Sequence, residues 1–275
     1  MDNNELIEGF SNEVRKNKKY KTISIELVNE EISNYLKSNP SIKRVNKSSI
    51  KEIRSRLHRL YSSYQTTKKN KRNLYLDRLK VESGNLEIIN EILSTSISAK
   101  ERIKKYNQVY KNIFQITDKP EVIVDIGCGL NPVSYPYMGL KKLNYYAYDI
   151  DEGDMDFLNK YFDIMKHHGL VGNAKLLDAR KNISEEIIEA DIIFLWKLLD
   201  LINSKNKKPS EDLIKSLSKK TKYLVVSFST KTLSGKTMNL PRRTGFEMML
   251  KRNLFDYKIL KIPNEIFYII GPFIK

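Results

Sequence analysis

From Glu121 to the end of the chain, short apolar runs alternate with segments of helical pattern. A chain that alternates in this way folds into a mostly parallel sheet with helices on both faces. The apolar runs are VIVDIG (122–127), YYAYDI (145–150), AKLLDA (174–179), DIIFLW (191–196), KYLVVSFS (222–229), YKIL (257–260) and EIFYIIG (265–271). They predict the α/β class and a Rossmann-like sheet of seven strands, whose last two strands form a reversed hairpin.

The first 117 residues have a different pattern, which is helical throughout. Apolar residues recur at intervals of three and four in IELVNEEISNYL and in IKEIRSRLHRLY, as on the buried face of an amphipathic helix. Pro40 separates these two segments, and a further helix is predicted over 100–115, before Pro120. The sequence therefore predicts an all-helical domain over 1–99 and an α/β domain over 100–275.

Basic residues are concentrated in two parts of the chain, whose net charge is +16. Residues 43–80 hold 13 Lys or Arg against two acidic side chains, and residues 204–275 hold 16 against five. Residues 121–203 between them hold eight against 14. Clustered cations favour polyanions, because neutralising phosphates releases counterions. The pattern favours nucleic-acid binding, and a solvated lysine-rich surface is the alternative.

Seven cations of the first basic part are the predicted phosphate contacts. Three lie off the apolar face of the helix predicted around IKEIRSRLHRLY, and four lie in TTKKNKRN, which is predicted to be an exposed connection between helices. These residues are Lys51, Arg54, Arg59, Lys68, Lys69, Lys71 and Arg72.

The composition disfavours several other classes of protein. A lone Cys128 cannot form an internal disulfide, and one Cys with three His predicts no metal centre. No run of about 18 apolar residues occurs, and the N-terminal residues MDNNELIEGF are polar, so we expect neither a membrane span nor an export signal. We therefore expect a cytoplasmic protein, and a monomer, since no unused apolar stripe calls for a partner.

The first apolar run leads into a glycine turn, DIGCGLNP. Gly127 and Gly129 follow a strand, where the lack of a Cβ lets the backbone turn tightly and approach a ligand. The complete dinucleotide pattern GxGxxG is missing because Pro132 stands at the third glycine position, and no GxxxxGK[ST] loop occurs. The turn therefore favours a ligand without a pyrophosphate.

Acidic residues end the next two predicted strands. Asp149 lies 20 residues after Gly129, a spacing suited to hydrogen bonds with ribose hydroxyls, and Asp178 ends the third run. Each aspartate could instead cap the following helix. Because the carboxyl ends of parallel strands meet at one edge of the sheet, their joint placement favours a nucleoside site there.

These motifs resemble those of the class I S-adenosylmethionine-dependent methyltransferases. Within that class they are similar to the aminoglycoside-resistance enzymes that methylate guanine N7 in small-subunit (16S-type) ribosomal RNA. The distinctive pieces are LHRLYSSY, the ER pair in SAKERIKKYNQVY, DIGCGLNP, AYDID, FLWKLLDLI, SFSTKTLSGK and NEIFYI. GCG and AYDID alone are typical of the whole class, whereas the helix with the ER pair together with SFSTKTLSGK is much more specific. The resemblance covers most of the chain from about residue 50. It implies a class I methyltransferase sheet preceded by an all-helical RNA-binding domain.

The resemblance implies S-adenosylmethionine as cofactor, bound by Tyr64, Arg102, Gly127, Gly129, Asp149, Asp178, Ala179 and Trp196. Gly127 and Gly129 would line the methionine, whose carboxylate would bind Arg102. The aspartate after the second strand would hold the ribose, and the Asp-Ala pair after the third would bracket the adenine. The tyrosine that ends LHRLYSSY would reach the cofactor from the N-terminal domain. Trp196 and Lys197 would lie beside the reacting methyl group, and no catalytic residue is assigned.

The resemblance also implies small-subunit ribosomal RNA as the partner, with a division of labour among the cations. Residues 43–80 would grip phosphates, and Lys231, Lys236, Arg242 and Arg243 would surround the target nucleotide. After SGK, the resistance enzymes continue with a Gly-Met-Glu motif, whereas this chain continues with TMNLPRRTGFE. Another ribosomal RNA site, another base atom or transfer RNA therefore stays open as the substrate.

Residues that other methyl acceptors would need are missing. No [ND]PP[YFW] motif follows the fourth strand, and Cys128 lies inside the glycine turn, where it is predicted to be a small buried residue rather than a nucleophile. Guanine N7 attacks with a lone pair and loses no proton, so it needs no general base. A non-catalytic RNA-binding or ribosome assembly factor that keeps the fold is the alternative from a different class.

Overall fold

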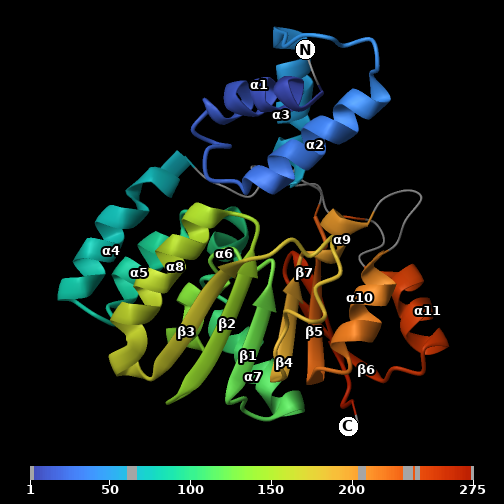
Figure 1. The fold of residues 1–275 in the computed structure, drawn as a ribbon. Coiled ribbons are helices and arrows are strands. Elements are labelled where there is room, and N and C mark those ends of the chain that lie inside the picture. Colours follow the sequence, from blue (N-terminus) through green and yellow to red (C-terminus); the bar gives the residue numbers. More distant parts are fainter. Residues whose placement is uncertain (1–2, 61–66, 204–208, 232–237, 239–241, 274–275) are drawn as a thin grey trace.

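The computed structural model describes residues 3–60, 67–203, 209–231, 238 and 242–273. It contains a seven-stranded sheet with the order β3-β2-β1-β4-β5-β7-β6 (Figure 1). The strands are β1 (Val122–Ile126), β2 (Leu143–Asp149), β3 (Leu170–Leu176), β4 (Ala190–Trp196), β5 (Thr221–Ser229), β6 (Tyr257–Ile262) and β7 (Glu265–Ile270). β7 is antiparallel to β5 and β6, and the other pairs are parallel. The predicted Rossmann-like sheet with its reversed hairpin is confirmed.

Both faces of the central strands are covered by helices. Ile123 and Phe194 belong to the apolar cluster of one face, whereas Val124 and Ile193 belong to that of the other. Because successive side chains of a strand point to opposite faces, a strand covered on both is apolar at nearly every position. The first face carries α4 (Arg72–Val81), α5 (Leu86–Leu93), α7 (Tyr106–Thr117) and α8 (Glu152–Met165), and the second carries α10 (Pro209–Leu217) and α11 (Thr244–Arg252).

Two elements differ from their predicted bounds by more than one or two residues. The strand expected over 174–179 is β3, which begins and ends earlier. β3 lies at the edge of the sheet, where Val171 and Leu176 are exposed, and a Cβ on its Gly172 would lie 2.2 Å from the Phe162 ring. Its sequence therefore lacks a continuous apolar run. The helix expected over 100–115 is divided into α6 (Ile97–Arg102) and α7.

The N-terminal unit, defined here as residues 3–60, has an apolar cluster of its own. It consists of α1 (Asn3–Arg15), α2 (Ile25–Ser38) and α3 (Lys47–Leu60), which pack around Phe10, Ile32 and Ile53. α4 and α5 instead cover α8 and the short helix η3 (Asn131–Tyr137), and their apolar residues join the core of the sheet. The core therefore divides between α3 and α4, earlier than the boundary expected at residues 99 and 100.

The N-terminal unit lies above the sheet in Figure 1, over the loop that follows β2. The Ser24 amide donates to the Ile150 carbonyl at 3.1 Å, and the Glu152 amide donates to the Thr22 carbonyl at 2.9 Å. These bonds join the connection between α1 and α2 to the start of α8. Within the described residues, no helix is long and apolar enough to cross a bilayer.

Candidate functional site

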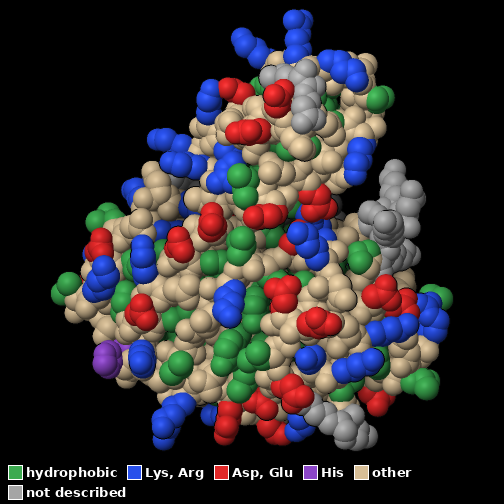
Figure 2. Space-filling view, viewed as in Figure 1, with side chains coloured by type: hydrophobic (Ala, Val, Ile, Leu, Met, Phe, Trp, Pro, Cys, Tyr) green, Lys and Arg blue, Asp and Glu red, His purple; other side chains and the backbone are tan. Residues whose placement is uncertain are grey.

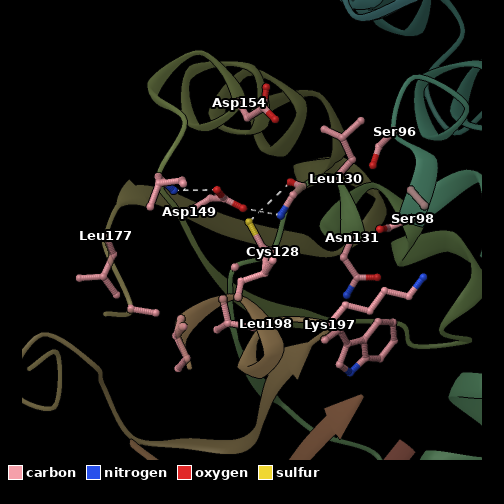
Figure 3. A pocket seen from close by; sticks show the side chains of 18 of the residues that line it. Ser96, Ser98, Cys128, Leu130, Asn131, Asp149, Asp154, Leu177, Lys197 and Leu198 are labelled. Atoms are coloured by element: carbon pink, nitrogen blue, oxygen red, sulfur yellow. Dashed lines mark hydrogen bonds between the residues drawn. The ribbon is translucent and has the colours of Figure 1, made fainter. Parts of the chain in front are cut away.

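A cavity opens at the carboxyl ends of β1 to β4, with about 1060 Å³ of empty space including its open mouth. All the predicted cofactor residues within the described ranges line it, and so does Lys197. They are Arg102, Gly127, Gly129, Asp149, Asp178, Ala179 and Trp196. Tyr64 lies outside the described residues. In Figure 3 the cavity runs from Leu177 at one end, past Asp149 and Leu198, to Asn131 and Lys197 at the other.

The glycine turn after β1 forms the floor of this cavity. Gly127 has a φ of +69° and its amide donates to the Tyr148 carbonyl at 2.8 Å, so the turn is bonded to the end of β2. A Cβ at Gly127 would lie 2.8 Å from Leu198 Cδ1. Gly129 has a φ of +49°, and a Cβ there would meet no atom within 4 Å. Both positions require a left-handed backbone that favours glycine, and Gly129 leaves open space where a ligand could lie.

Asp149 ends β2 and is fixed by two backbone amides. Gly129 N–H donates to its Oδ2 at 2.8 Å, and Ile150 N–H donates to its Oδ1 at 2.7 Å. Burial raises the pKa of Asp149 to about 6, although the Gly129 amide opposes the shift. A carboxylate oxygen accepts more than one hydrogen bond, so this fixed side chain can still accept hydroxyl donors from a ligand.

Asp178 follows β3 and is held by Arg180. The Arg180 guanidinium donates from Nε to Asp178 Oδ1 at 3.0 Å and from Nη2 to Oδ2 at 2.7 Å, and the Arg180 amide also donates to Oδ1. Burial disfavours the ionised form of Asp178, but these hydrogen bonds and the arginine charge outweigh it and lower the pKa. Asp178 is therefore an ionised acceptor in the cavity wall.

Arg102 lies at the opposite end of the cavity, paired with a carboxylate from the last strand. It is 4 % exposed and donates from Nε to Glu265 Oε2 at 2.8 Å and from Nη2 to Oε1 at 2.6 Å. Its guanidinium lies over the Trp196 ring, 4.8 Å from the centroid. Burial disfavours ionised Glu265, but the Arg102 charge outweighs it and lowers the pKa of Glu265. Arg102 keeps further N–H donors for an anion in the cavity.

Lys197 follows β4 with a strained backbone. Its φ is +56°, a left-handed value that residues other than glycine rarely adopt. Its amide donates to the Ser227 carbonyl at 3.0 Å. Its Nζ lies 2.8 Å from Glu101 Oε2 and 3.9 Å from Glu265 Oε2. Such strain clusters at functional sites, and here it directs the ammonium toward the end of the cavity that holds Arg102.

Several lining residues were missed by the sequence reasoning. They include Leu27, Ser96, Ser98, Asn131, Ile150, Leu177, Arg180 and Leu198. Asn131 had a signal in the sequence, because it closely follows the glycine turn and the apolar strand before that turn contains an acidic residue, Asp125. Its Nδ2 donates to Asp125 Oδ2 at 2.8 Å, and Tyr145 Oη donates to the same oxygen at 2.6 Å. Burial raises the pKa of Asp125 to about 6.

The predicted phosphate contacts fall into two groups. Lys51, Arg59, Lys68 and Lys71 have exposed side chains, and Figure 2 shows Lys and Arg side chains around the N-terminal unit at the top of the view. Arg72 corrects the prediction, because it is 4 % exposed and cannot reach a phosphate. Its Nε donates to Thr95 Oγ1 and its Nη1 to Asp154 Oδ1, both at 2.6 Å. An arginine inside a basic run was indistinguishable by sequence from its solvated neighbours.

Four other predicted cations are partnered within the chain. Arg54 donates to the Glu13 carbonyl at 2.5 Å, and Lys69 Nζ lies 3.1 Å from Asp151 and 2.9 Å from Asp154. Arg242 pairs with Glu247, and Arg243 pairs with Asp200 at 2.7 Å. Lys231 is half-buried, and Lys236 lies outside the described residues.

Comparison with known proteins finds relatives over most of the chain. Residues 16–269 match the model of the family described as "Ribosomal RNA methyltransferase (FmrO)". Two relatives named 16S rRNA (guanine(1405)-N(7))-methyltransferase, from Proteus mirabilis and Micromonospora rosea, are each 26% identical to this chain. The first alignment covers 80% of this chain and 83% of the relative, and the second covers 80% and 81%.

Solved structures show the same fold. The crystal structure of 16S rRNA methyltransferase RmtF in complex with S-adenosyl-L-homocysteine has a TM-score of 0.77 at 21% identity, and the alignment covers 99% of both chains. The 16S rRNA methylase RmtB has a TM-score of 0.71 at 20% identity and covers 97% of this chain and 98% of its own. The family match spans nearly the whole chain and confirms the resemblance drawn from the motifs. The chain therefore belongs to the ribosomal RNA methyltransferase family.

Proposed function

We propose that this chain transfers the methyl group of S-adenosylmethionine to N7 of a guanine in 16S ribosomal RNA. The observation that carries the proposal is the convergence of the glycine turn, Asp149, Asp178 and Trp196 on one cavity, in a chain of this family. The relatives named for guanine N7 support the choice of atom, since they align over four fifths of the chain.

The lining residues fit this cofactor. The space beside Gly129 is one that a side chain would fill. Asp149 offers carboxylate oxygens beside that space, suited to ribose hydroxyls, and Arg102 offers N–H donors suited to a carboxylate. Ile150, Leu177 and Leu198 provide apolar walls for a flat ring. When bound, S-adenosylmethionine supplies an electrophilic methyl group.

In this proposal the residues of the chain act mainly by positioning. Orientation alone lowers a reaction barrier by several kcal/mol, roughly 7–11 when the reacting atoms are well aligned. Asp149 would fix the ribose and Arg102 the carboxylate of the cofactor, and the strained Lys197 would border the target base. The guanine would leave its stack to reach the methyl group.

The chemistry of N7 matches the side chains available. Guanine N7 donates a lone pair and releases no proton, so no base has to accept one. The cavity lining within the described residues includes no histidine, and burial raises the pKa of the Cys128 thiol well above its usual range, so Cys128 is a poor nucleophile. Exposed cations such as Lys51, Arg59 and Lys71 would hold the RNA phosphates. We further propose that the enzyme acts on ribosomal subunits in the cytoplasm, as a monomer and without a metal.

The decisive experiment is transfer of a radiolabelled methyl group from S-adenosylmethionine to intact small subunits, naked 16S RNA and bulk transfer RNA. We expect label as 7-methylguanosine in the small subunit. Label in another nucleoside or only in transfer RNA would assign another substrate to the same fold. No label despite cofactor binding would favour a non-catalytic assembly factor. If the modified guanine lies where aminoglycosides bind, expression in a susceptible bacterium should raise resistance to them.

A matched pair of glycine variants separates cavity effects from backbone strain. Gly129 and Gly139 both have positive φ, and a Cβ at either would meet no atom within 4 Å, but only Gly129 lines the cavity. Both Gly129→Leu and Gly139→Leu incur the left-handed cost of about 1–2 kcal/mol. We expect Gly129→Leu to abolish cofactor binding in calorimetry and methyl transfer, and Gly139→Leu to retain both. Equal loss in the two variants would refute the placement of the cofactor.

A further inference from the structure

Part of the cavity wall comes from the N-terminal unit. Leu27 of α2 is buried and lines the cavity at the same end as Ile150 and Leu177. This end also contains Asp178 and Arg180, where the proposed function places the nucleoside of the cofactor. The N-terminal unit, which carries exposed cations for RNA, therefore also shapes the cofactor cavity.

The loop after β2 is bonded to the N-terminal unit. Thr22 Oγ1 donates to Asp151 Oδ2 at 2.8 Å, and the Ser24 amide donates to the Ile150 carbonyl. The contact is close, because a Cβ on Gly153 would lie 2.9 Å from Thr22 Cγ2. Asp149, which is fixed by the Ile150 amide, thus belongs to a loop whose position depends on the N-terminal unit.

The loop after β3 is bonded to the same unit by one arginine. Arg180 holds Asp178 with Nε and Nη2, and it also donates from Nη1 to Glu31 Oε1 at 2.9 Å and from Nη2 to Glu30 Oε2 at 3.1 Å. Glu30 and Glu31 lie on α2, and neither lines the cavity. The side chain of Arg180 is 22% exposed and that of Glu31 is 12% exposed, so the pair is less screened than a surface pair.

We propose that Arg180 is a positioning residue that fixes the nucleoside end of the cavity against α2, and that cofactor binding and RNA binding strengthen each other through this link. The inference rests on the proposed function for the identity of the two ligands. One guanidinium bridges a carboxylate in the cavity wall and two carboxylates of the N-terminal unit. A ligand that orders either side of the bridge reduces the ordering cost that the other ligand has to meet.

Linkage makes this effect reciprocal. If occupancy of the cavity raises the affinity of the N-terminal unit for RNA by some factor, RNA must raise cofactor affinity by the same factor. Such coupling is typically about 5- to 150-fold. A residue that only stabilises the fold would change both affinities without changing the coupling between them.

The test removes the α2 side of the bridge without touching the cavity. We compare Glu30→Gln/Glu31→Gln with Glu5→Gln/Glu8→Gln, which removes the same charge from exposed positions on α1. Affinity for S-adenosylhomocysteine is measured by calorimetry with and without purified bacterial small subunits. We expect the α2 variant to bind S-adenosylhomocysteine at least about fivefold more weakly than the wild type. It should also lose most of the increase in affinity that small subunits cause. The α1 variant should match the wild type.

A double-mutant cycle identifies the route of the effect. If the two glutamates act through Arg180, adding Glu30→Gln/Glu31→Gln to Arg180→Gln should change S-adenosylhomocysteine affinity by less than about twofold, since coupled residues are not additive. In methyl-transfer kinetics, the α2 variant should raise KM for the cofactor while kcat changes little. Thermal midpoints without ligand report on folding separately.

The outcomes distinguish this inference from the proposed function. Unchanged coupling to subunits in the α2 variant, or additive effects in the cycle, would overturn the role of Arg180 while leaving methyl transfer intact. Absence of S-adenosylhomocysteine binding by the wild type would instead overturn the proposed cofactor, and the inference with it.

Discussion

The pKa of Asp149 predicts that ligand binding in the cavity depends on pH. Burial raises this pKa to about 6, within the range where proteins are commonly assayed. Protonation turns one carboxylate oxygen into a donor and weakens it as an acceptor, so a ligand that donates hydrogen bonds from two hydroxyls prefers the ionised form. Asp178, whose pKa is lowered by Arg180, stays ionised over the same range.

We therefore expect the affinity for S-adenosylhomocysteine to be constant above about pH 7 and to fall below about pH 6, by at most about tenfold per pH unit. Calorimetry across this range measures the profile. Asp178→Asn serves as the control, because it should weaken binding at every pH while keeping the shape of the curve. A flat wild-type profile would show that Asp149 does not titrate or does not bind the ligand.

The stability of the unliganded protein should respond in the opposite direction. A carboxyl whose pKa rises from 3.8 to about 6 on folding binds its proton more tightly in the folded state. Its contribution to the free energy of unfolding is complete below its unfolded pKa and is lost as the pH rises through about 6. Through this group, mild acid thus stabilises the unliganded protein while it weakens ligand binding.

Secondary-structure elements were predictable where one periodicity dominates. β1 and β4 are covered on both faces and read as apolar runs, and α2 shows a regular apolar stripe. β3 was misplaced because an edge strand has one exposed side and its Gly172 leaves room for the Phe162 ring. Packing against a distant residue decides that case, and periodicity does not record it.

In helix α4, the sequence likewise does not show which charged residues are buried. Arg72 and Arg78 have the same side chain on one helix, yet Arg72 is buried against Asp154, whereas Arg78 and its partner Glu91 have side chains that are 47% and 41% exposed. Removing one partner of a buried pair leaves an unbalanced charge without water. An exposed pair contributes little.

We expect Arg72→Ala to lower the free energy of unfolding by about 3 kcal/mol, the lower end of the range for buried pairs, because Lys69 still contacts Asp154 at 2.9 Å. Arg78→Ala should cost less than about 1 kcal/mol. Urea unfolding followed by circular dichroism compares the two variants. Equal losses would mean that the burial of Arg72 has no energetic consequence.

At the scale of the whole molecule, the distribution of charged residues was visible in the sequence, but the pairs that these residues form were not. The basic parts and the acidic middle were predicted, whereas the bond between Arg180 and Glu31 joins residues 149 positions apart, and the pair of Arg102 and Glu265 joins residues 163 positions apart. No local pattern encodes such partners. The cavity residues that follow strands were found because the fold itself brings strand ends together.

The RNA surface can be tested by charge reversal. We expect Lys51→Glu/Arg59→Glu/Lys71→Glu to weaken binding to small subunits and to lower the salt slope of the binding constant by about two or more, given about 0.7–0.9 per phosphate contact. The control reverses the charge of three exposed lysines at the opposite edge of the sheet, where β1 and β2 begin: Lys119, Lys141 and Lys142. Filter binding at several salt concentrations measures both slopes. A larger change in the control would place the RNA on that edge.

Trp196 gives the molecule an intrinsic optical reporter. It is the single tryptophan of the chain, it lines the cavity, and it lies beneath the Arg102 guanidinium. Indole emission depends on nearby charge and on access to water, and both change when an anion or a sulfonium enters this end of the cavity. Selective excitation of the indole would therefore record occupancy of this end of the cavity without a label, in a chain whose other large aromatic residues are tyrosine and phenylalanine.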